Sequence, residues 1–158
     1  KVGQGAKDKE FCDILEFKET GPMEIIHVKK HGGSNALNYL FSQARFYCDA
    51  FLRDEIFLAE IRNHIQKSEC AFKDQMLEHV KEKQSEVYGN EYSVGLWVLY
   101  DGKKEPPSKL KLPLMAKYEL KIAYEQLRNV FKYAEVYLSM VPVNMTNYTK
   151  SFKNTPAR

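Results

Sequence analysis

The spacing of hydrophobic and polar positions changes along the chain, and the two spacings predict two kinds of element. Apolar residues run almost continuously or alternate with polar ones, as in strands, over residues 11–17, 23–30, 92–100 and 134–143. They recur three or four positions apart, as on one face of a helix, over residues 34–53, 55–66, 71–88 and 116–133. This order predicts an α/β (α+β) domain in which helices flank a mixed sheet, in the sequence β-β-α-α-α-β-α-β.

Length and polar segments set the domain organisation. With 158 residues the chain has the length of one domain, which we assign to residues 1–143. Residues 144–158 contain three basic residues and no acidic one, and this composition predicts a flexible basic tail. Ser34 is the expected N-cap of the first helix. An alternative left open is that the domain is the C-terminal part of a longer protein.

Composition narrows the class of protein. Hydrophobic residues make up 44% and charged residues 28% of the chain, which is typical of a globular domain. The net charge of only +3 gives no strong signal for a polyanion, so the distribution of charge matters more than its sum. Three widely spaced cysteines without a CxxC motif predict neither a zinc site nor a disulfide framework. No apolar run approaches the ~18 residues of a membrane span, so we expect a cytoplasmic protein that does not bind membranes.

Three polar residues on the first two predicted strands form the main chemical candidate. Side chains two positions apart on a strand share a face, so His27 and Lys29 point the same way. If the two strands pair as a hairpin, Asp13 lies beside them. Mg²⁺ prefers oxygen ligands, whereas an imidazole such as His27 favours Mn²⁺ or a later transition metal.

This order of residues on a β-β-α layout resembles the metal-nuclease core of the restriction-endonuclease-like (PD-(D/E)xK) superfamily. The resemblance implies that Asp13 holds Mg²⁺ or Mn²⁺, that His27 is a substituted metal ligand or a catalytic base, and that Lys29 orients or activates the water that attacks phosphorus. Gln43 begins a QxxxY pattern similar to that of the RecB-like branch, which implies a residue that positions the substrate backbone. His27 stands where the pattern has a carboxylate. Three alternatives therefore remain open: an unusual metal, an acid from elsewhere in the chain, or a degenerate site.

Two longer blocks resemble a sporadically distributed family of uncharacterised bacterial proteins. The first runs from residue 12 to residue 43 and contains His-Val-Lys and Gly-Gly-Ser, and the second runs from residue 112 to residue 120. The chain departs from that pattern at Asn38-Tyr39, where the family has Ser-His. The resemblance implies a protein of the mobile, phage-defence-associated gene pool and no established activity.

Basic residues cluster after the third predicted strand, where residues 103–121 hold six lysines against two glutamates. Such an excess favours a surface that contacts phosphates, and the alternative left open is a solvated loop followed by an ordinary helix surface. The candidate nucleic-acid contacts are Lys30, Arg45, Lys103, Lys104, Lys109 and Lys111. We therefore expect a nucleic-acid-binding protein with metal-dependent phosphodiesterase activity. The alternative is a non-catalytic domain that kept the fold and binds nucleic acid or a protein partner. The choice of DNA or RNA and a homodimeric state are left open.

Overall fold

The computed structural model describes residues 11–108 and 111–145, which form an α+β domain on one mixed four-stranded sheet. Its strands, in the spatial order β1-β2-β3-β4, are Ile14–Glu16 (β1), Met23–Lys30 (β2), Tyr92–Asp101 (β3) and Glu135–Val143 (β4). β1 pairs with β2 antiparallel, whereas β2, β3 and β4 run parallel. The predicted fold class and element order are confirmed, and the finer restriction-endonuclease-like assignment stays a prediction.

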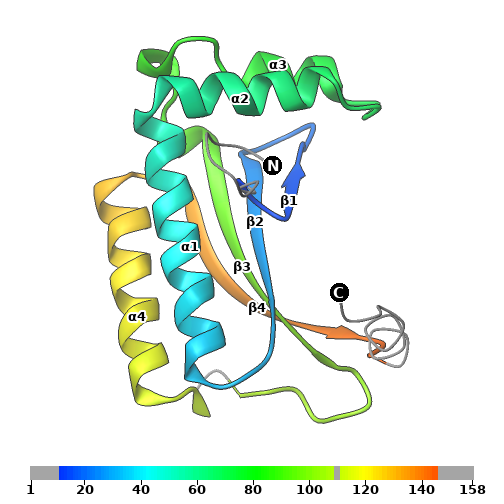
Figure 1. Cartoon of the computed structure of the whole chain (residues 1–158), viewed down its shortest axis with the longest axis vertical. Helices are drawn as coiled ribbons and strands as arrows, with labels where there is room; N and C mark the ends of the chain where they lie inside the picture. The colour runs from blue at the N-terminus through cyan, green and yellow to red at the C-terminus, as the bar shows by residue number, and fades with distance from the viewer. Residues whose placement is uncertain (1–10, 109–110, 146–158) are drawn as a thin grey trace, which may run out of the picture.

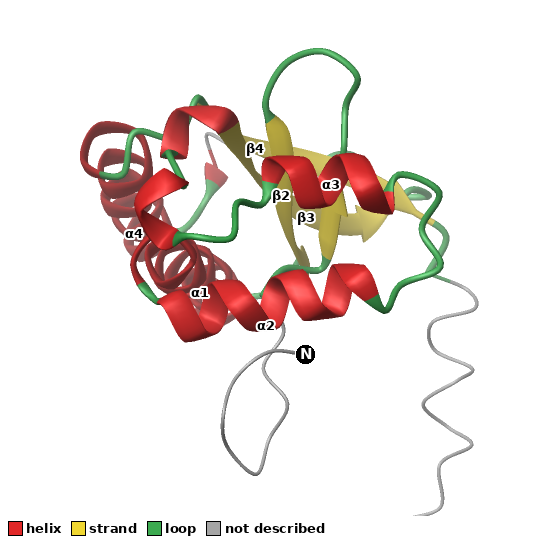
Figure 2. Cartoon of the chain, turned by 90° about the horizontal axis from the view of Figure 1, so that it is seen from above, coloured by secondary structure: helices red, strands yellow, loops and turns green. Residues whose placement is uncertain are grey.

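The α-helices flank one face and one end of the sheet (Figure 1). They are Ser34–Arg53 (α1), Glu55–Gln66 (α2), Lys73–His79 (α3) and Leu114–Tyr124 (α4). α1 and α4 stand side by side, and α1 contacts β2 and β3. α2 and α3 lie across the amino ends of the parallel strands (Figure 2). The carboxyl ends of these strands therefore lie at the opposite end of the domain, where α1 and α4 begin. We call this end the carboxyl edge.

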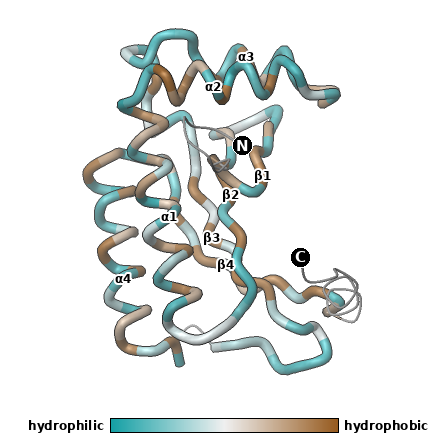
Figure 3. Tube along the Cα trace, viewed as in Figure 1, coloured by the Kyte–Doolittle hydropathy of each residue, from teal (hydrophilic) through white to brown (hydrophobic). Residues whose placement is uncertain are grey.

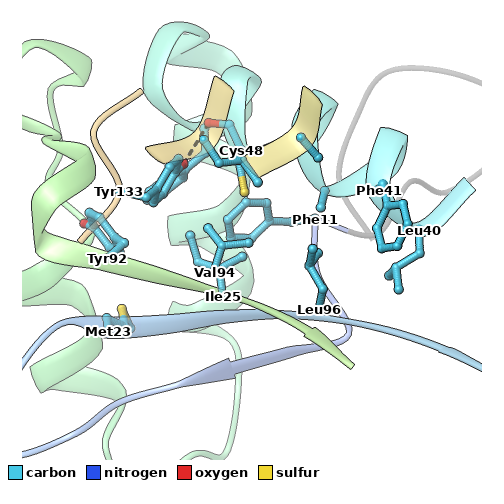
Figure 4. Close-up of a cluster of buried hydrophobic side chains, with 14 of the residues drawn as sticks. Phe11, Met23, Ile25, Leu40, Phe41, Cys48, Tyr92, Val94, Leu96 and Tyr133 are labelled. Carbon is cyan, nitrogen blue, oxygen red and sulfur yellow. Dashed lines mark hydrogen bonds between the residues drawn. The ribbon is translucent and has the colours of Figure 1, made fainter. Parts of the chain in front are cut away.

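The hydrophobic core fills the space between the sheet and α1. Alternate residues of β2 and β3, among them Ile25, Val94 and Leu96, are fully buried on this side. Figure 4 shows them beneath Cys48 of α1, whose carbonyl oxygen accepts a hydrogen bond of 2.8 Å from the hydroxyl of Tyr133. Burying each aliphatic side chain stabilises the fold by roughly 2 kcal/mol, so this face fixes the register of the strands.

The ends of α1 and α2 follow from local sequence. Asp54 caps α2, because its carboxylate accepts hydrogen bonds of 3.0 Å from the backbone N–H groups of Ile56 and Phe57. The prediction that Ser34 caps α1 is wrong. Gly33 occupies the N-cap position and has no side chain to accept a capping hydrogen bond. Ser34 is the first helical residue.

The predicted helix over residues 71–88 is also wrong in length, because α3 ends at His79. Side chains from distant elements bind the carbonyl groups at this point. Arg62 donates to the carbonyl oxygens of Leu77 and Val80, and the Tyr92 hydroxyl donates to that of His79 at 2.7 Å. These tertiary bonds satisfy the last carbonyls of a helix, and two short 3-10 turns, Gln84–Glu86 and Gly89–Glu91, replace the rest of the predicted helix.

The predicted helix over residues 116–133 begins earlier and changes geometry. α4 starts at Leu114 and passes into a π-helical turn, Glu125–Val130, in which the Phe131 N–H donates to the Gln126 carbonyl oxygen at 2.8 Å. Lys132 follows with a positive φ of 62°, a conformation uncommon for residues other than glycine. This turn directs Tyr133 into the core before β4 begins.

Candidate functional site

Asp13 lies just before β1, and the hairpin uses its carboxylate. Oδ2 accepts a hydrogen bond from the Val28 N–H at 2.6 Å, and the Asp13 N–H donates to the Ile26 carbonyl oxygen at 3.0 Å. These two bonds extend the pairing of β1 with β2 by one residue beyond Ile14. The strand itself, Ile14–Glu16, is shorter than the predicted 11–17. Asp13 therefore lies beside β2, as predicted, with its carboxylate bound to backbone.

His27 lies inside the hydrophobic core. Its side chain is fully buried and points toward α1, where Nε2 lies 3.9 Å from Cys48 Sγ. Nδ1 has no hydrogen-bond partner among the residues that the structure describes. Burial lowers the pKa of His27 to about 4 and raises the pKa of the Cys48 thiol to about 12. At neutral pH His27 is an uncharged core residue.

No hydrogen bond joins the side chains of Lys29, Gln43 and His27, all of which the structure describes. Lys29 is half-buried, and its Nζ lies 4.5 Å from the centre of the Tyr39 ring, a cation–π contact with the first turns of α1. Gln43 is half-buried on α1. Tyr47, the other residue of the QxxxY pattern, stacks on Phe57 of α2 with ring centroids 5.9 Å apart. The tyrosine of the pattern therefore packs on α2.

The described residues do not supply the donor set that Mg²⁺ or Mn²⁺ prefers. No group of three or more His, Cys, Asp and Glu side chains in residues 11–108 and 111–145 is arranged to hold a metal ion. Asp13 offers one exposed carboxylate, and the ring of His27 points into the core toward Cys48. Hard divalent cations need several oxygen ligands, so the metal assignment to these two residues stays a prediction that this geometry does not favour.

The role of Asp13 in the hairpin can be measured directly. Asp13→Ala removes the acceptor of the Val28 N–H, so we expect the free energy of unfolding to fall by about 1 kcal/mol. Urea denaturation followed by circular dichroism would measure the change. Asp13→Asn keeps a side-chain oxygen and should recover part of the loss. Equal losses in both variants would contradict the hydrogen-bonding role.

Four of the predicted nucleic-acid contacts lie at the carboxyl edge. Lys30 ends β2, Lys103 and Lys104 follow β3, and Lys111 precedes α4, all four with exposed side chains. The turn after β3 is held by Asp101, whose Oδ1 accepts from the Lys103 N–H at 3.1 Å. We call these four residues the carboxyl-edge lysines.

The two other predicted contacts are not at this edge. Arg45 is eleven residues into α1, about 16 Å along the helix axis, and lines a groove with Gln126 and Val130 of the π-helical turn. Lys109 lies outside the described residues. The sequence prediction therefore grouped residues that the fold places on two surfaces.

Comparison with known proteins supplies a family. A family model described as a family of unknown function, DUF6119, matches residues 1–142. The chain belongs to DUF6119. No curated protein and no solved structure matches it significantly. None of the helices in the described part of this DUF6119 chain has the length and apolar character needed to cross a bilayer.

Sequence reasoning missed a polar cluster on the sheet face that points away from α1. The Glu24 carboxylate, largely buried, accepts a hydrogen bond of 2.8 Å from the Tyr137 hydroxyl and pairs with Lys18 Nζ at 2.5 Å. Burial, and then the bond to Glu24, raise the pKa of Tyr137 to about 12. The Tyr137 side chain crosses Gly95 of β3, where a Cβ would lie 2.8 Å from the hydroxyl oxygen. A glycine within an apolar strand signals such a close approach, and Gly95 was the available sequence signal.

Proposed function

We propose that this DUF6119 domain is a non-catalytic nucleic-acid-binding domain that binds through its carboxyl edge. The observation that carries the proposal is the exposure of the carboxyl-edge lysines at the end of the sheet where α1 and α4 begin. Ligands of sheets with parallel strands and flanking helices bind at the carboxyl ends of the strands, so the fold and the charge favour the same surface.

The electrostatics of this edge suit phosphate groups. Neither α1 nor α4 has an acidic residue in its first turn or a side-chain cap on its N-terminus, and uncapped helix N-termini favour anions. The connection from β3 to α4 is hydrophilic over most of its length (Figure 3). Its described acidic residues are Asp101, whose carboxylate is bound in the turn, and Glu105.

The predicted catalytic residues support the non-catalytic alternative. The Asp13 carboxylate binds the Val28 N–H, His27 is a neutral core residue, and Lys29 packs on Tyr39. No hydrogen bond or ion pair joins the side chains of any two of Asp13, His27, Lys29 and Gln43, all of which the structure describes. Metal-dependent cleavage needs these groups around one reacting phosphate, and the burial of a neutral His27 in the core supports the non-catalytic alternative.

Nucleic-acid binding is tested by charge reversal at the carboxyl edge. We expect Lys104→Glu with Lys111→Glu to weaken the binding of fluorescent single-stranded or double-stranded oligonucleotides at least about tenfold. Because two phosphate contacts are lost, the slope of log K against log salt should also decrease in magnitude by about 2. Fluorescence anisotropy over a salt series gives both quantities. The matched control, Lys67→Glu with Lys83→Glu, changes the same charge at the opposite end of the domain and should keep wild-type binding.

A cleavage assay that compares the wild type with Asp13→Ala decides between a nuclease and a non-catalytic domain. Cleavage of DNA or RNA with Mg²⁺ or Mn²⁺ that disappears in Asp13→Ala would contradict the non-catalytic proposal and support the nuclease. Absence of binding at low salt, or equal weakening in the edge and control variants, would contradict binding at the carboxyl edge.

A further inference from the structure

A second surface, which is apolar where the carboxyl edge is basic, lies between α4 and β4. An apolar cavity of about 560 Å³ opens there. Its apolar lining comes from β3, β4, α4 and the residue before Pro113: Leu96, Leu112, Leu120, Tyr124, Val136 and Leu138. α4 packs mainly along α1, and the cavity opens on its side next to β4. We call this surface the β4 groove.

The outer edge of β4 has the backbone groups that a further strand needs. β4 is the last strand in the order, and none of the described residues pairs with its outer edge. Every second residue of an edge strand directs its N–H and C=O outward. Pro142 lacks an N–H and limits pairing to the part of β4 before it, so the segment from Glu135 to Val141 is the open template.

The first turns of α4 also carry large exposed apolar side chains. Leu114 is 81% exposed, and Met115 and Tyr118 are each 57% exposed. None of the three lines the cavity, but Leu114 lies one helical turn before Lys117, which does. The unpaired strand edge and the cavity lie side by side, so an extended chain can use both at once.

We propose that the β4 groove binds an extended, acidic segment of a partner protein by strand addition to β4. In this mode main-chain hydrogen bonds supply affinity, and side chains at alternate positions enter pockets beside the strand. Alternate side chains of the added strand point to the α4 side of the sheet. Apolar residues there would fill the cavity between Val136, Leu138 and Leu120.

Charge selects an acidic partner. Lys117 and Lys121 are exposed and line the groove from α4. Lys121 Nζ also lies 3.7 Å from Glu125 Oε1, in an exposed ion pair that a partner carboxylate would share or replace. Acidic residues at the ends of the added segment would face these two lysines. A second copy of the chain is disfavoured, because two-fold pairing of β4 with β4 would bring the two lysine pairs toward each other, and like charges destabilise such contacts. Residues 144–158 of the chain carry three basic residues and no acid, so they do not provide the complementary charge.

A pair of synthetic peptides tests the proposal. The first, Asp-Thr-Val-Thr-Leu-Thr-Asp with both ends blocked, places two acids and two apolar residues on one side of a strand, and the second has lysine in place of aspartate. Titration into the whole ¹⁵N-labelled chain should give saturable NMR shifts in β4 and α4 with the acidic peptide. The lysine peptide should bind about tenfold more weakly, the difference that two partly exposed ion pairs supply.

Charge reversal in the protein provides the decisive control. Lys117→Glu with Lys121→Glu should invert the preference in favour of the lysine peptide, whereas Lys67→Glu with Lys83→Glu should leave it unchanged. Circular dichroism checks that both variants fold. No saturable binding, shifts that map away from β4, or an unchanged preference in the groove variant would each overturn the proposal. A peptide-sensitive dimer of the free chain in sedimentation velocity would overturn it in favour of a second copy.

Discussion

Replacing Gly89 by alanine is expected to lower the free energy of unfolding by about 3 kcal/mol or more, near the upper end for an overpacked site. Gly89 is buried in the 3-10 turn that leads into β3. A Cβ there would collide with the carbonyl oxygen of Phe131, in the turn that leads into β4. The Phe131 carbonyl belongs to the backbone of a turn that two hydrogen bonds of 2.8 Å hold in place. The Phe131 N–H donates to the Gln126 carbonyl oxygen, and the Ala134 N–H donates to the Tyr92 carbonyl oxygen. The clash therefore cannot be relieved by rotating a side chain.

Urea denaturation and the thermal midpoint would measure this loss. The matched control is Gly33→Ala, because a Cβ at Gly33 meets nothing within 4 Å and the backbone there has φ −64° and ψ 178°. This conformation is open to alanine, and exchange of glycine for alanine at an N-cap should cost less than about 1 kcal/mol. Similar losses in the two variants would contradict the close approach of the two turns.

The elements that the sequence predicted well are those whose ends depend on local residues. β2 and α2 were predicted with their observed ends, because the apolar period changes at Gly32-Gly33 and again at Asp54. The C-terminus of α3 could not be predicted, since it depends on Arg62, fifteen residues away from Leu77 along the chain. The π-helical turn likewise depends on placing Tyr133 against Cys48, a contact between residues 85 positions apart.

The candidate site shows the same division between pattern and environment. Alternation along β2 correctly placed His27 on one face and Glu24 on the other. It could not show which face α1 covers, and that decides the chemistry of both residues. His27 became a core residue, whereas Glu24 entered a polar cluster with Tyr137 on the opposite face. A polar residue on a strand therefore indicates a site only after the covered face is known.

The burial of His27 gives the second large expected effect, a loss of stability in mild acid. Its pKa is about 4 in the folded chain and about 6.5 in an unfolded chain. Between these two values the unfolded state binds more protons, so the free energy of unfolding falls as the pH decreases from 6.5 toward 4. For one such group the loss is about 2 kcal/mol between pH 7 and pH 5, and about 3 kcal/mol when complete.

His27→Leu removes this proton-linked loss. We expect this variant to keep or raise the stability at pH 7, because it also removes the Nδ1 atom that has no partner among the described residues. At pH 5 we expect it to be clearly more stable than the wild type. Urea denaturation at a series of pH values, with the difference between the two proteins plotted against pH, isolates the contribution of His27 from that of the carboxylates. His31→Gln, at an exposed position four residues along the chain, is the control and should keep the wild-type profile. A difference that does not change between pH 7 and pH 5 would show that His27 is accessible to protons in the folded chain, and would return it to the list of residues able to bind a metal or a substrate.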